Sequence, residues 1–407
     1  MHILLIHQAF AALDEAGGTR HYEMAAHLVQ RGHRVTVISS PVSYLTGHSR
    51  QAHPRWLEQD RPSPGITILR AYTYSALHRS FTHRVLSFLS FMLSSFLIGL
   101  KVSQVDLVWG TSPPIFQGFT AWLLARLKRV PFLLEIRDLW PEFAIEVGVL
   151  RNPLLIRASL WLERFLYRRA DLVVVNSPGF IRHVTRLGAR RVELVSNGAD
   201  PAMFDPALEG TEFRRQYGLE GKFVALYAGA HGLSNDLGVI LRSAHQLAGD
   251  DSIRFVLIGD GKEKSALVNQ AQALNLDNVL FLQSIAKTEM SQALAAANAC
   301  IAILKPLECY KTTYPNKVFD YMAAGRPVIL AIDGVIRQVV EDAGAGLFVP
   351  PGDTNALTRA VRCLAENPQT ARQMGHSGRA CIAQKFNRSL LAEQFSLLVE
   401  EIVRQNA

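Results

Sequence analysis

The fold is most clearly indicated by the segment YPNKVFDYMAAGRPV, residues 314–328. Pro315 is placed just before a helix start, Gly325 fits the left-handed exit of that helix, and Pro327 cannot continue it. A short apolar run follows directly at residues 328–331. The segment therefore predicts a helix that leads into a buried strand, which is the repeating unit of a parallel α/β sheet.

Similar apolar runs recur along both halves of the chain. In the second half they occupy residues 223–227, 254–258, 279–282, 299–304 and 328–331, and in the first half residues 2–7, 34–39, 106–109, 131–136 and 171–175. Segments with helical spacing separate them, and unbroken apolar strands are typical of parallel sheets that are covered on both faces. The sequence therefore predicts an α/β protein with two Rossmann-like, doubly wound domains and a cleft between them.

The domain boundary is expected where turn-forming residues interrupt the chain, at Asn197, Gly198, Pro201, Pro206 and Gly218. We expect a first domain of residues 1–200, a second domain of residues 201–387, and a C-terminal helix at residues 388–407 that packs back across one of them. Ligands of such folds bind beyond the carboxyl ends of the strands.

The composition excludes several classes of protein. Apolar residues make up 49% and charged residues 19% of the 407, which excludes a disordered or collagen-like chain. The cysteines, Cys300, Cys309, Cys363 and Cys381, fit neither zinc-binding pairs nor a disulfide framework and predict a reducing, cytoplasmic location. No basic segment precedes the apolar run at residues 3–6, so this run is interpreted as a strand rather than a signal peptide.

Positive charge is concentrated in the first half. Residues 1–200 contain 23 Lys and Arg against 14 Asp and Glu, a balance of +9, whereas residues 201–407 contain 20 against 21. The first half is therefore expected to attract a polyanion or an anionic membrane surface. Nucleic acid is the rival partner, but the sequence has no nucleic-acid-binding motif and no aromatic residues interleaved with the basic ones, so we expect no nucleic acid.

Two glycine-containing turns follow strands of the second half. Gly259 and Gly261 form a Gly-x-Gly turn that opens a helix, and Gly229 precedes His231 in a second turn. Backbone amides in such turns can hold a phosphate, and His231 could donate to a diphosphate. The alternatives are an ordinary tight turn and an exposed loop histidine without a role.

Lys317 and Asp320 lie three residues apart in the first turn of the helix quoted above. The lysine can meet a phosphate beside the helix N-terminus, and the carboxylate can accept hydrogen bonds from ribose hydroxyls. The alternative is an ion pair between the two side chains on the surface.

The segment at residues 85–100 contains no charge and is shorter than the roughly 20 apolar residues that span a bilayer. Serines 87, 90 and 94 form one stripe, so we expect the remaining apolar side chains to lie in the membrane interface. These are Phe88, Leu89, Phe91, Met92, Phe96 and Leu97, flanked by the basic residues His78, Arg79, His83, Arg84 and Lys101. The alternative is an ordinary buried helix.

Several motifs together resemble glycosyltransferase family 4 over nearly the whole chain. They are Gly17-Gly18, GHRVTV at 32–37, NGAD at 197–200, GDG at 259–261 and YMAAGRPV at 321–328. The motifs IRDLWP at 136–141 and PNKVFD at 315–320 resemble the WbuB-like branch of O-antigen, capsule and colanic-acid glycosyltransferases.

The resemblance implies a GT-B fold, with the donor in the C-terminal domain and the acceptor in the N-terminal domain. It implies a retaining glycosyltransferase that uses neither a metal ion nor a resident cofactor. The donor would be a UDP-sugar, for example one carrying N-acetylfucosamine, and the acceptor a polyprenyl-diphosphate-linked sugar of bacterial surface polysaccharide at the inner face of the membrane. No Asp-x-Asp motif is present to hold a divalent ion.

The resemblance also assigns roles to individual residues. Donor binding is expected from Gly229, His231, Asn235, Gly259, Gly261, Ile285, Asn316, Lys317 and Asp320. Acceptor binding is expected from Gly17, Gly18, Arg20, Arg137 and Asp138, and the catalytic residues would be Asp138 and Lys317. Asp138 orients the acceptor in a front-face displacement under this hypothesis, and its alternative role is to cap the following helix.

The sequence departs from the family pattern at several donor positions. The family's Glu-x7-Glu motif is replaced by Thr312 and Asp320, and Glu308 is a candidate substitute for the first glutamate. The basic residues that usually bind the diphosphate are replaced by Ala230 and Asn235. These losses motivate one alternative, a nucleotide-sugar-binding module without turnover. A second alternative is a UDP-sugar epimerase of the same fold, against which the hydrophobic segment at residues 85–100 argues.

Overall fold

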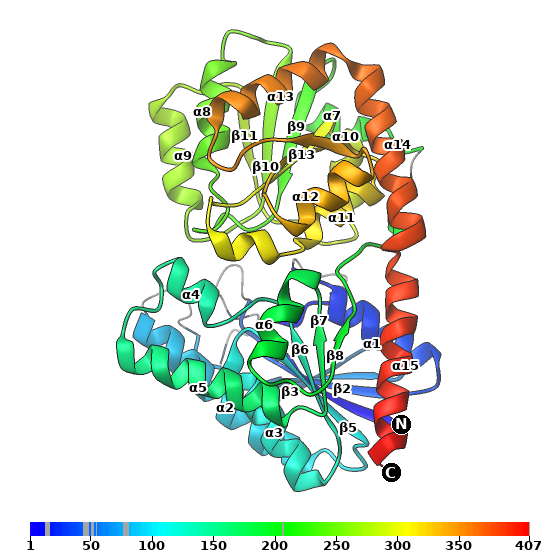
Figure 1. Ribbon diagram of the computed structural model, residues 1–407. Helices are drawn as coiled ribbons and strands as arrows, with labels where there is room; N and C mark the ends of the chain where they lie inside the picture. The colour runs from blue at the N-terminus through cyan, green and yellow to red at the C-terminus, as the bar shows by residue number, and fades with distance from the viewer. Residues whose placement is uncertain are drawn as a thin grey trace. The chain divides into compact units, whose positions relative to one another are not determined.

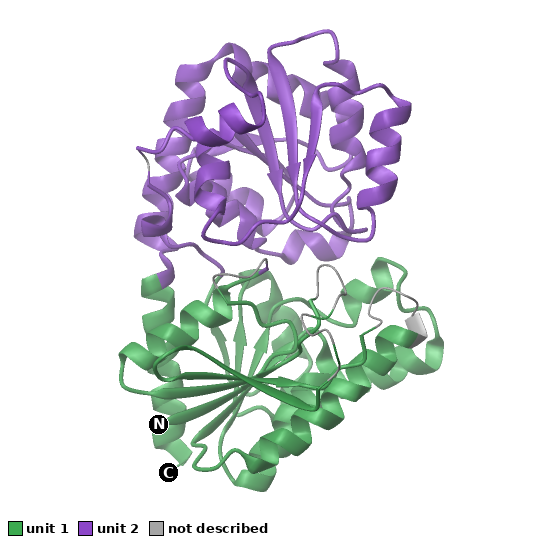
Figure 2. Cartoon of the chain, turned by 180° about the vertical axis from the view of Figure 1, so that it is seen from behind, with its two compact units in different colours: residues 1–12, 18–196, 389–407 green, residues 13–17, 197–388 purple. Residues whose placement is uncertain are grey.

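The computed structural model describes residues 1–12, 17–43, 49, 53, 55–75, 81–205 and 207–406. It contains two compact units, each built around its own sheet (Figures 1 and 2). The first unit is formed by residues 1–12, 18–196 and 389–407, and the second by Gly17 and residues 197–388. The predicted pair of α/β domains with parallel sheets is confirmed.

The sheet of the first unit has eight strands in the order β3-β4-β2-β1-β5-β6-β7-β8. The strands are β1 (His2–Ile6), β2 (Arg34–Ser39), β3 (Leu57–Ser63), β4 (Ile66–Ala71), β5 (Leu107–Ser112), β6 (Phe132–Ile136), β7 (Leu172–Val175) and β8 (Val192–Leu194). Among the described strands of this sheet, β3 and β4 are the one antiparallel pair. Every residue of β1 and β7 is buried, as expected of strands covered by helices on both faces.

The helices of this unit are α1 (Arg20–Gln30), α2 (Phe81–Lys101), α3 (Ile115–Lys128), α4 (Glu142–Glu146), α5 (Pro153–Arg169), the 3₁₀ helix η1 (Pro178–Phe180) and α6 (Ile181–Arg186). The start of α5 follows from its sequence. The Asn152 side chain accepts hydrogen bonds from the first backbone amides, and Pro153 occupies the first helical position.

The C-terminal helix α15 (Arg388–Asn406) contributes its residues from Ser389 onward to the first unit. Phe395 of this helix lies against Trp109 of β5 with ring centroids 4.6 Å apart, and Ile402 belongs to the same buried cluster. The boundary between the units falls at Ser196/Asn197 and again at Arg388/Ser389. Of the turn residues named above, Pro206 lies outside the described residues.

The sheet of the second unit has six parallel strands in the order β11-β10-β9-β12-β13-β14. The strands are β9 (Phe223–Ala228), β10 (Ile253–Ile258), β11 (Val279–Leu282), β12 (Ala299–Ile303), β13 (Val328–Ala331) and β14 (Gly346–Phe348). The order changes direction between β9 and β12, and the carboxyl ends of strands at such a point are the usual ligand position.

The helices of this unit follow the strands in sequence. They are η2 (Pro201–Met203), α7 (Thr211–Gln216), α8 (Gly238–Gln246), α9 (Lys264–Ala273), α10 (Met290–Ala296), η3 (Glu308–Thr312), α11 (Asn316–Ala323), α12 (Val335–Asp342), α13 (Thr354–Glu366) and α14 (Pro368–Lys385). Helix α11 is the helix predicted from the opening segment, and it leads into β13 as expected.

The predicted orientation of the apolar helix α2 was only partly right, since Leu89 and Leu97 are exposed as predicted but Phe91 is not. Ser87, Ser94 and Phe91 are buried, and the exposed face consists of leucines instead. These are Leu86, Leu89, Leu93, Leu97 and Leu100. Small side chains mark the packing face because they permit close approach: a Cβ on Gly99 would lie 2.5 Å from Leu124 of α3. The flanking residues His78 and Arg79 lie outside the described residues.

Candidate functional site

The two glycine turns of the second unit pack against each other at the carboxyl ends of β9 and β10. Gly259 and Gly261 have φ of 150° and 151°, a region that side chains disfavour. A Cβ on Gly259 would lie 1.9 Å from the Gly229 carbonyl oxygen, and a Cβ on Gly261 would lie 2.6 Å from the carbonyl oxygen of His231. Loop packing thus accounts for both glycines, and a contact of either glycine with phosphate stays a prediction.

Helix α11 directs Lys317 toward the end of β9. Its Nζ donates to the Tyr227 hydroxyl at 2.8 Å, lies 3.4 Å from Oδ1 of Asn235, and sits 4.1 Å from the centroid of the Tyr227 ring. Gly229 leaves room for the ammonium, since a Cβ there would lie 2.7 Å from Nζ. The structure therefore brings together the predicted donor residues Gly229, Asn235 and Lys317.

The charge of Lys317 is not balanced by a nearby acid. In the part of the chain that the structure describes, no carboxylate lies within ion-pair distance of its Nζ. Burial lowers the pKa of Lys317 to about 7, because desolvation disfavours the charged ammonium. An anion that binds beside Nζ of Lys317 would therefore supply the counter-ion that this lysine lacks.

His231 is fully buried, so the alternative of an exposed loop histidine is wrong. Its backbone amide donates to the Asp260 carbonyl at 2.8 Å, while neither ring nitrogen has a hydrogen-bond partner among the described residues. Burial, with the charges of Lys264 and Lys317, lowers the pKa of His231 to about 4. The ring is therefore neutral at neutral pH, and its donation to a diphosphate stays a prediction.

Asp320 does not pair with Lys317, which excludes the alternative of an ion pair between them. Its Oδ2 lies 2.6 Å from the Nζ of Lys287 and accepts a longer hydrogen bond, 3.4 Å, from Asn316. Lys287 lies in the loop between β11 and α10, which also contains Ile285. Lys287 was not predicted from the sequence, because a single lysine in a loop without a motif gives no signal.

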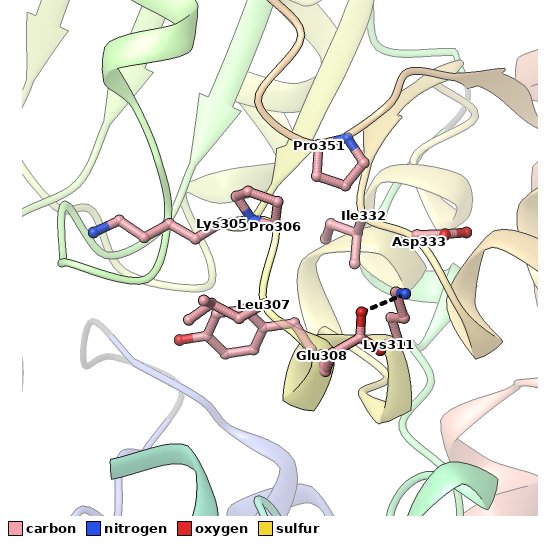
Figure 3. Close-up of a pocket in the computed structure, with 9 residues that line it drawn as sticks. Lys305, Pro306, Leu307, Glu308, Lys311, Ile332, Asp333 and Pro351 are labelled. Atoms are coloured by element: carbon pink, nitrogen blue, oxygen red, sulfur yellow. Dashed lines mark hydrogen bonds and ion pairs between the residues drawn. The ribbon is translucent and has the colours of Figure 1, made fainter. Parts of the chain in front are cut away.

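Thr312 and Glu308, at and near the position of the missing family glutamate, make contacts within η3. The hydroxyl of Thr312 donates to the Cys309 carbonyl, and Glu308 is exposed and forms an ion pair with Lys311 at 2.6 Å (Figure 3). This pair lines a pocket of about 160 Å³ at the ends of β12 and β13. Its other lining residues are Lys305, Pro306, Leu307, Tyr310, Ile332, Asp333 and Pro351.

In the first unit, Arg137 and Asp138 follow β6. Arg137 lies 3.3 Å from Nε2 of His7, and none of the described residues donates a hydrogen bond to the Asp138 carboxylate. Burial raises the pKa of Asp138 to about 6, against the lowering effect of Arg137. Helix α4 has Pro141 at its N-cap, so Asp138 does not cap it. Asp138 as an acceptor-orienting residue stays a prediction.

Arg20 occupies a buried network rather than an open surface. Its guanidinium donates to Glu135 at 2.9 Å and to the backbone carbonyls of Val195 and Ser196. Glu135 also accepts a hydrogen bond from His21. Burial alone would raise the pKa of Glu135, but the charges and hydrogen bonds of His21 and Arg20 hold that pKa well below its ordinary value. This network joins Glu135 of β6 to the segment that follows β8, and a contact of Arg20 with the acceptor stays a prediction.

Glu135 and His7 were missed by the sequence analysis. Glu135 interrupts the apolar run at 131–136, and a lone charge inside a buried strand is a usable signal. Of the predicted acceptor glycines, Gly17 has φ of 149° and a Cβ on Gly18 would meet no atom within 4 Å. Among the described residues no group of three or more His, Cys, Asp and Glu side chains could hold a metal ion.

Comparison with known proteins identifies both units. A glycosyl transferase 4-like domain matches residues 16–198, and a glycosyl transferases group 1 domain matches residues 210–380. WcaI of Escherichia coli, named for colanic acid biosynthesis, is 24% identical over 355 residues, which cover 84% of this chain and 86% of WcaI.

Solved structures show the same fold. Sucrose-phosphate synthase of Thermosynechococcus elongatus superposes with a TM-score of 0.80 at 21% identity over 99% of both chains. HepE of Anabaena, solved with UDP-glucose, gives a TM-score of 0.72 at 16% identity over 98% of this chain and 100% of HepE. The chain belongs to glycosyltransferase family 4 and is a transferase with the GT-B fold.

Proposed function

We propose that this enzyme is a retaining, metal-independent glycosyltransferase that transfers a sugar from a UDP-sugar to a polyprenyl-diphosphate-linked acceptor during synthesis of bacterial surface polysaccharide. The observation that carries the donor assignment is the cluster of Lys317, Tyr227, Asn235 and Gly229 at the point where the strand order of the second unit reverses. UDP as the nucleotide is supported by the UDP and UDP-glucose complexes of HepE.

The cluster suits a diphosphate because Lys317 has no carboxylate partner among the described residues and the Asn235 side chain beside it carries an Nδ2 that can donate. A charge-assisted hydrogen bond contributes on the order of 1.5–3 kcal/mol, and we assign Lys317 and the neutral His231 ring to the diphosphate. Asn316 and Asp320 lie on the same helix as Lys317, and we assign Asp320 to the ribose hydroxyls. Ile285 is assigned to the base.

For the reaction we propose displacement on one face of the donor sugar. The bond between the anomeric carbon and the phosphate oxygen breaks while the acceptor oxygen bonds to the same face, so the configuration is retained. The acceptor's proton passes to the leaving diphosphate oxygen, whose charge Lys317 stabilises. Asp138 orients the acceptor hydroxyl, and no protein nucleophile takes part.

The acceptor assignment is supported by the outer surface of α2, α3 and α5, in which α3 packs against both other helices (Figure 1). We call this surface the helical layer. Its exposed large apolar side chains are the five leucines of α2, Leu127 of α3, and Leu154, Leu155, Leu160 and Trp161 of α5. The α2 leucines recur every three or four residues, so they form one continuous face.

The charges of the helical layer are almost all positive. Its basic residues are Arg84, Lys101, Arg126, Lys128, Arg157, Arg164, Arg168 and Arg169. The one acid in these three helices, Glu163, is buried and accepts hydrogen bonds from Tyr167 and His183. A basic residue near an anionic membrane contributes about 1 kcal/mol. The anionic diphosphate head of a polyprenyl-linked acceptor lies at the surface of such a membrane.

Helix α2 is the one described helix that is long and apolar enough to cross a membrane by length and composition alone. Its Phe91 and Ile98 belong to the core of the first unit together with β1 residues, and the helix contacts β2, β4 and α3. Crossing a bilayer would expose these core contacts to lipid. We therefore propose that the enzyme binds peripherally to the inner face of the cytoplasmic membrane through the leucine face.

The test is a panel of nucleotide sugars incubated with membranes that carry polyprenyl diphosphate N-acetylhexosamine, in EDTA, with the lipid product identified by mass. Transfer from a UDP-sugar that is lost in Lys317→Met supports the proposal. Hydrolysis to free sugar without a lipid product would identify the epimerase alternative. Transfer that requires an added divalent cation would refute the metal-independent mechanism.

A further inference from the structure

Lys287 and Asp320 form a nearly buried ion pair within the second unit. Nζ of Lys287 lies 2.6 Å from Oδ2 of Asp320, and the two side chains are only 10% and 15% exposed. The same ammonium lies 5.5 Å from the ring centroid of Phe204, which is 2% exposed. Exposed ion pairs are worth little, but a pair shielded from solvent holds its geometry and is costly to break from one side.

The pair joins two segments that are assigned to different parts of the nucleotide. Lys287 comes from the loop between β11 and α10, two residues after Ile285, which is assigned to the base. Asp320 comes from α11, which also carries Lys317. The Lys287 pair thereby fixes the distance between the loop assigned to the base and the helix assigned to the ribose.

The two oxygens of the Asp320 carboxylate are used differently. Oδ2 faces Lys287 and accepts from Asn316, whose own Oδ1 accepts from Arg388 at 3.0 Å. In the described part of the chain, no group donates a hydrogen bond to Oδ1. Because Oδ2 is held in place, the carboxylate presents Oδ1 in a fixed direction. This direction matters because Asp320 is one methylene shorter than the glutamate of the family pattern.

Lys287 also changes the charge that a diphosphate would meet. An unpaired Asp320 would repel the phosphates, whereas the pair with Lys287 is neutral. The unbalanced charge of Lys317 then remains available for the diphosphate. The two lysines therefore have separate tasks, because Lys317 faces Tyr227 and Lys287 faces Asp320.

We propose that Lys287 is a positioning residue for nucleotide recognition, which orients the Asp320 carboxylate toward the ribose hydroxyls and offsets its charge. This inference rests on the proposed function, in which the second unit binds a nucleotide sugar. It predicts that loss of Lys287 weakens binding of nucleotides that carry ribose hydroxyls much more than binding of nucleotides that lack them.

The experiment compares UDP with 2′,3′-dideoxy-UDP by calorimetry on the full chain. In Lys287→Met, UDP affinity falls by about tenfold, as expected for loss of a charge-assisted contact, while dideoxy-UDP affinity changes by less than about twofold. Lys287→Arg keeps the cation and restores most of the UDP affinity. Lys385→Met, which removes an exposed lysine at the end of α14, serves as the matched control.

A double-mutant cycle with Asp320→Asn separates positioning from direct binding. If Lys287 acts through Asp320, the Lys287→Met change costs no further UDP affinity once Asp320 is replaced. Equal losses for UDP and dideoxy-UDP in Lys287→Met, or additive losses in the cycle, would overturn the inference. If the wild-type protein binds no UDP, the donor assignment itself fails; if UDP binding is lost in Lys317→Met but unchanged in Lys287→Met, only this inference fails.

Discussion

Donor binding is expected to be coupled to protonation of Lys317. In the empty protein the pKa of this lysine is lowered by burial to about 7 from the ordinary value of 10.5. A diphosphate at Nζ supplies the missing counter-charge and raises that pKa again. The protein therefore takes up a proton when the donor binds at a pH above 7.

The magnitude follows from linkage between proton and ligand binding. With a pKa of about 7 in the empty site, binding takes up about 0.9 proton at pH 8 and about 0.1 proton at pH 6. Affinity falls by about tenfold per pH unit above pH 7 and levels off below it. Without ligand, the free energy of unfolding shows the opposite trend: it rises with pH between about 7 and 10.5, the pKa values of Lys317 in the folded protein and its ordinary value. In this range the unfolded chain binds more protons than the folded protein.

The assay is calorimetry of UDP-glucose in buffers of different ionisation enthalpy, because this ligand has no phosphate proton that titrates near neutral pH. The number of protons is read from the buffer dependence of the binding enthalpy. Lys317→Met should abolish both the proton uptake and the slope of affinity with pH, and Lys385→Met should change neither. Binding of UDP-glucose at pH 8 without proton uptake would refute the reasoning.

Three further predictions concern other parts of the molecule. Turnover should fall as the pH drops below about 6, because burial raises the pKa of Asp138 to that value. Asp138→Asn should lower kcat and remove this acid limb of the pH–rate profile. An unchanged profile in the variant would exclude Asp138 from the reaction. The double substitution Leu93→Ser and Leu97→Ser should abolish co-sedimentation with anionic liposomes. The control Leu390→Ser, at a similarly exposed leucine of α15, should not. Equal co-sedimentation of the two variants would count against membrane binding through the leucine face. Gly261→Ala should lower stability by about 1–3 kcal/mol because its Cβ meets backbone in the neighbouring loop, and an unchanged thermal melting temperature would show that the two turns are not packed as described.

Much of the fold was predictable because strands buried on both faces leave unbroken apolar runs. The run at 34–39 coincides with β2, and the helix and strand of the opening segment are α11 and β13. Strand β3 was missed because its sequence, LEQDRPS, is polar and its structure depends on pairing with β4. Strand β14 has only three residues, too few for a periodic pattern.

The orientation of α2 shows why a face cannot be assigned from polarity alone. Its serines donate to carbonyl oxygens, as Ser94 does to Tyr72 and Phe91, so the hydroxyls are satisfied when buried. Their small size allows the helix to pack closely, and the bulkier leucines are left outside. Polar residues that can bond to the backbone do not mark the solvent side.

The candidate site was predictable in its motif residues and not in their partners. Lys317 and Asp320 stand out because they share one helical turn, but Tyr227 and Lys287 reach them from a strand and a loop far away in the sequence. The packing role of Gly259 and Gly261 was also not visible in the sequence, since the space that each leaves is filled by backbone of the neighbouring loop. Contacts of this kind become visible only once the chain is folded.

The central claim is that the second unit holds the donor diphosphate with Lys317 and without a metal ion. A crystal structure of the protein grown with UDP-glucose and EDTA tests it directly. The account predicts a diphosphate oxygen within about 3 Å of Lys317 Nζ, with Asp320 on the ribose. A diphosphate bound elsewhere, with Lys317 still directed only at Tyr227, would contradict it.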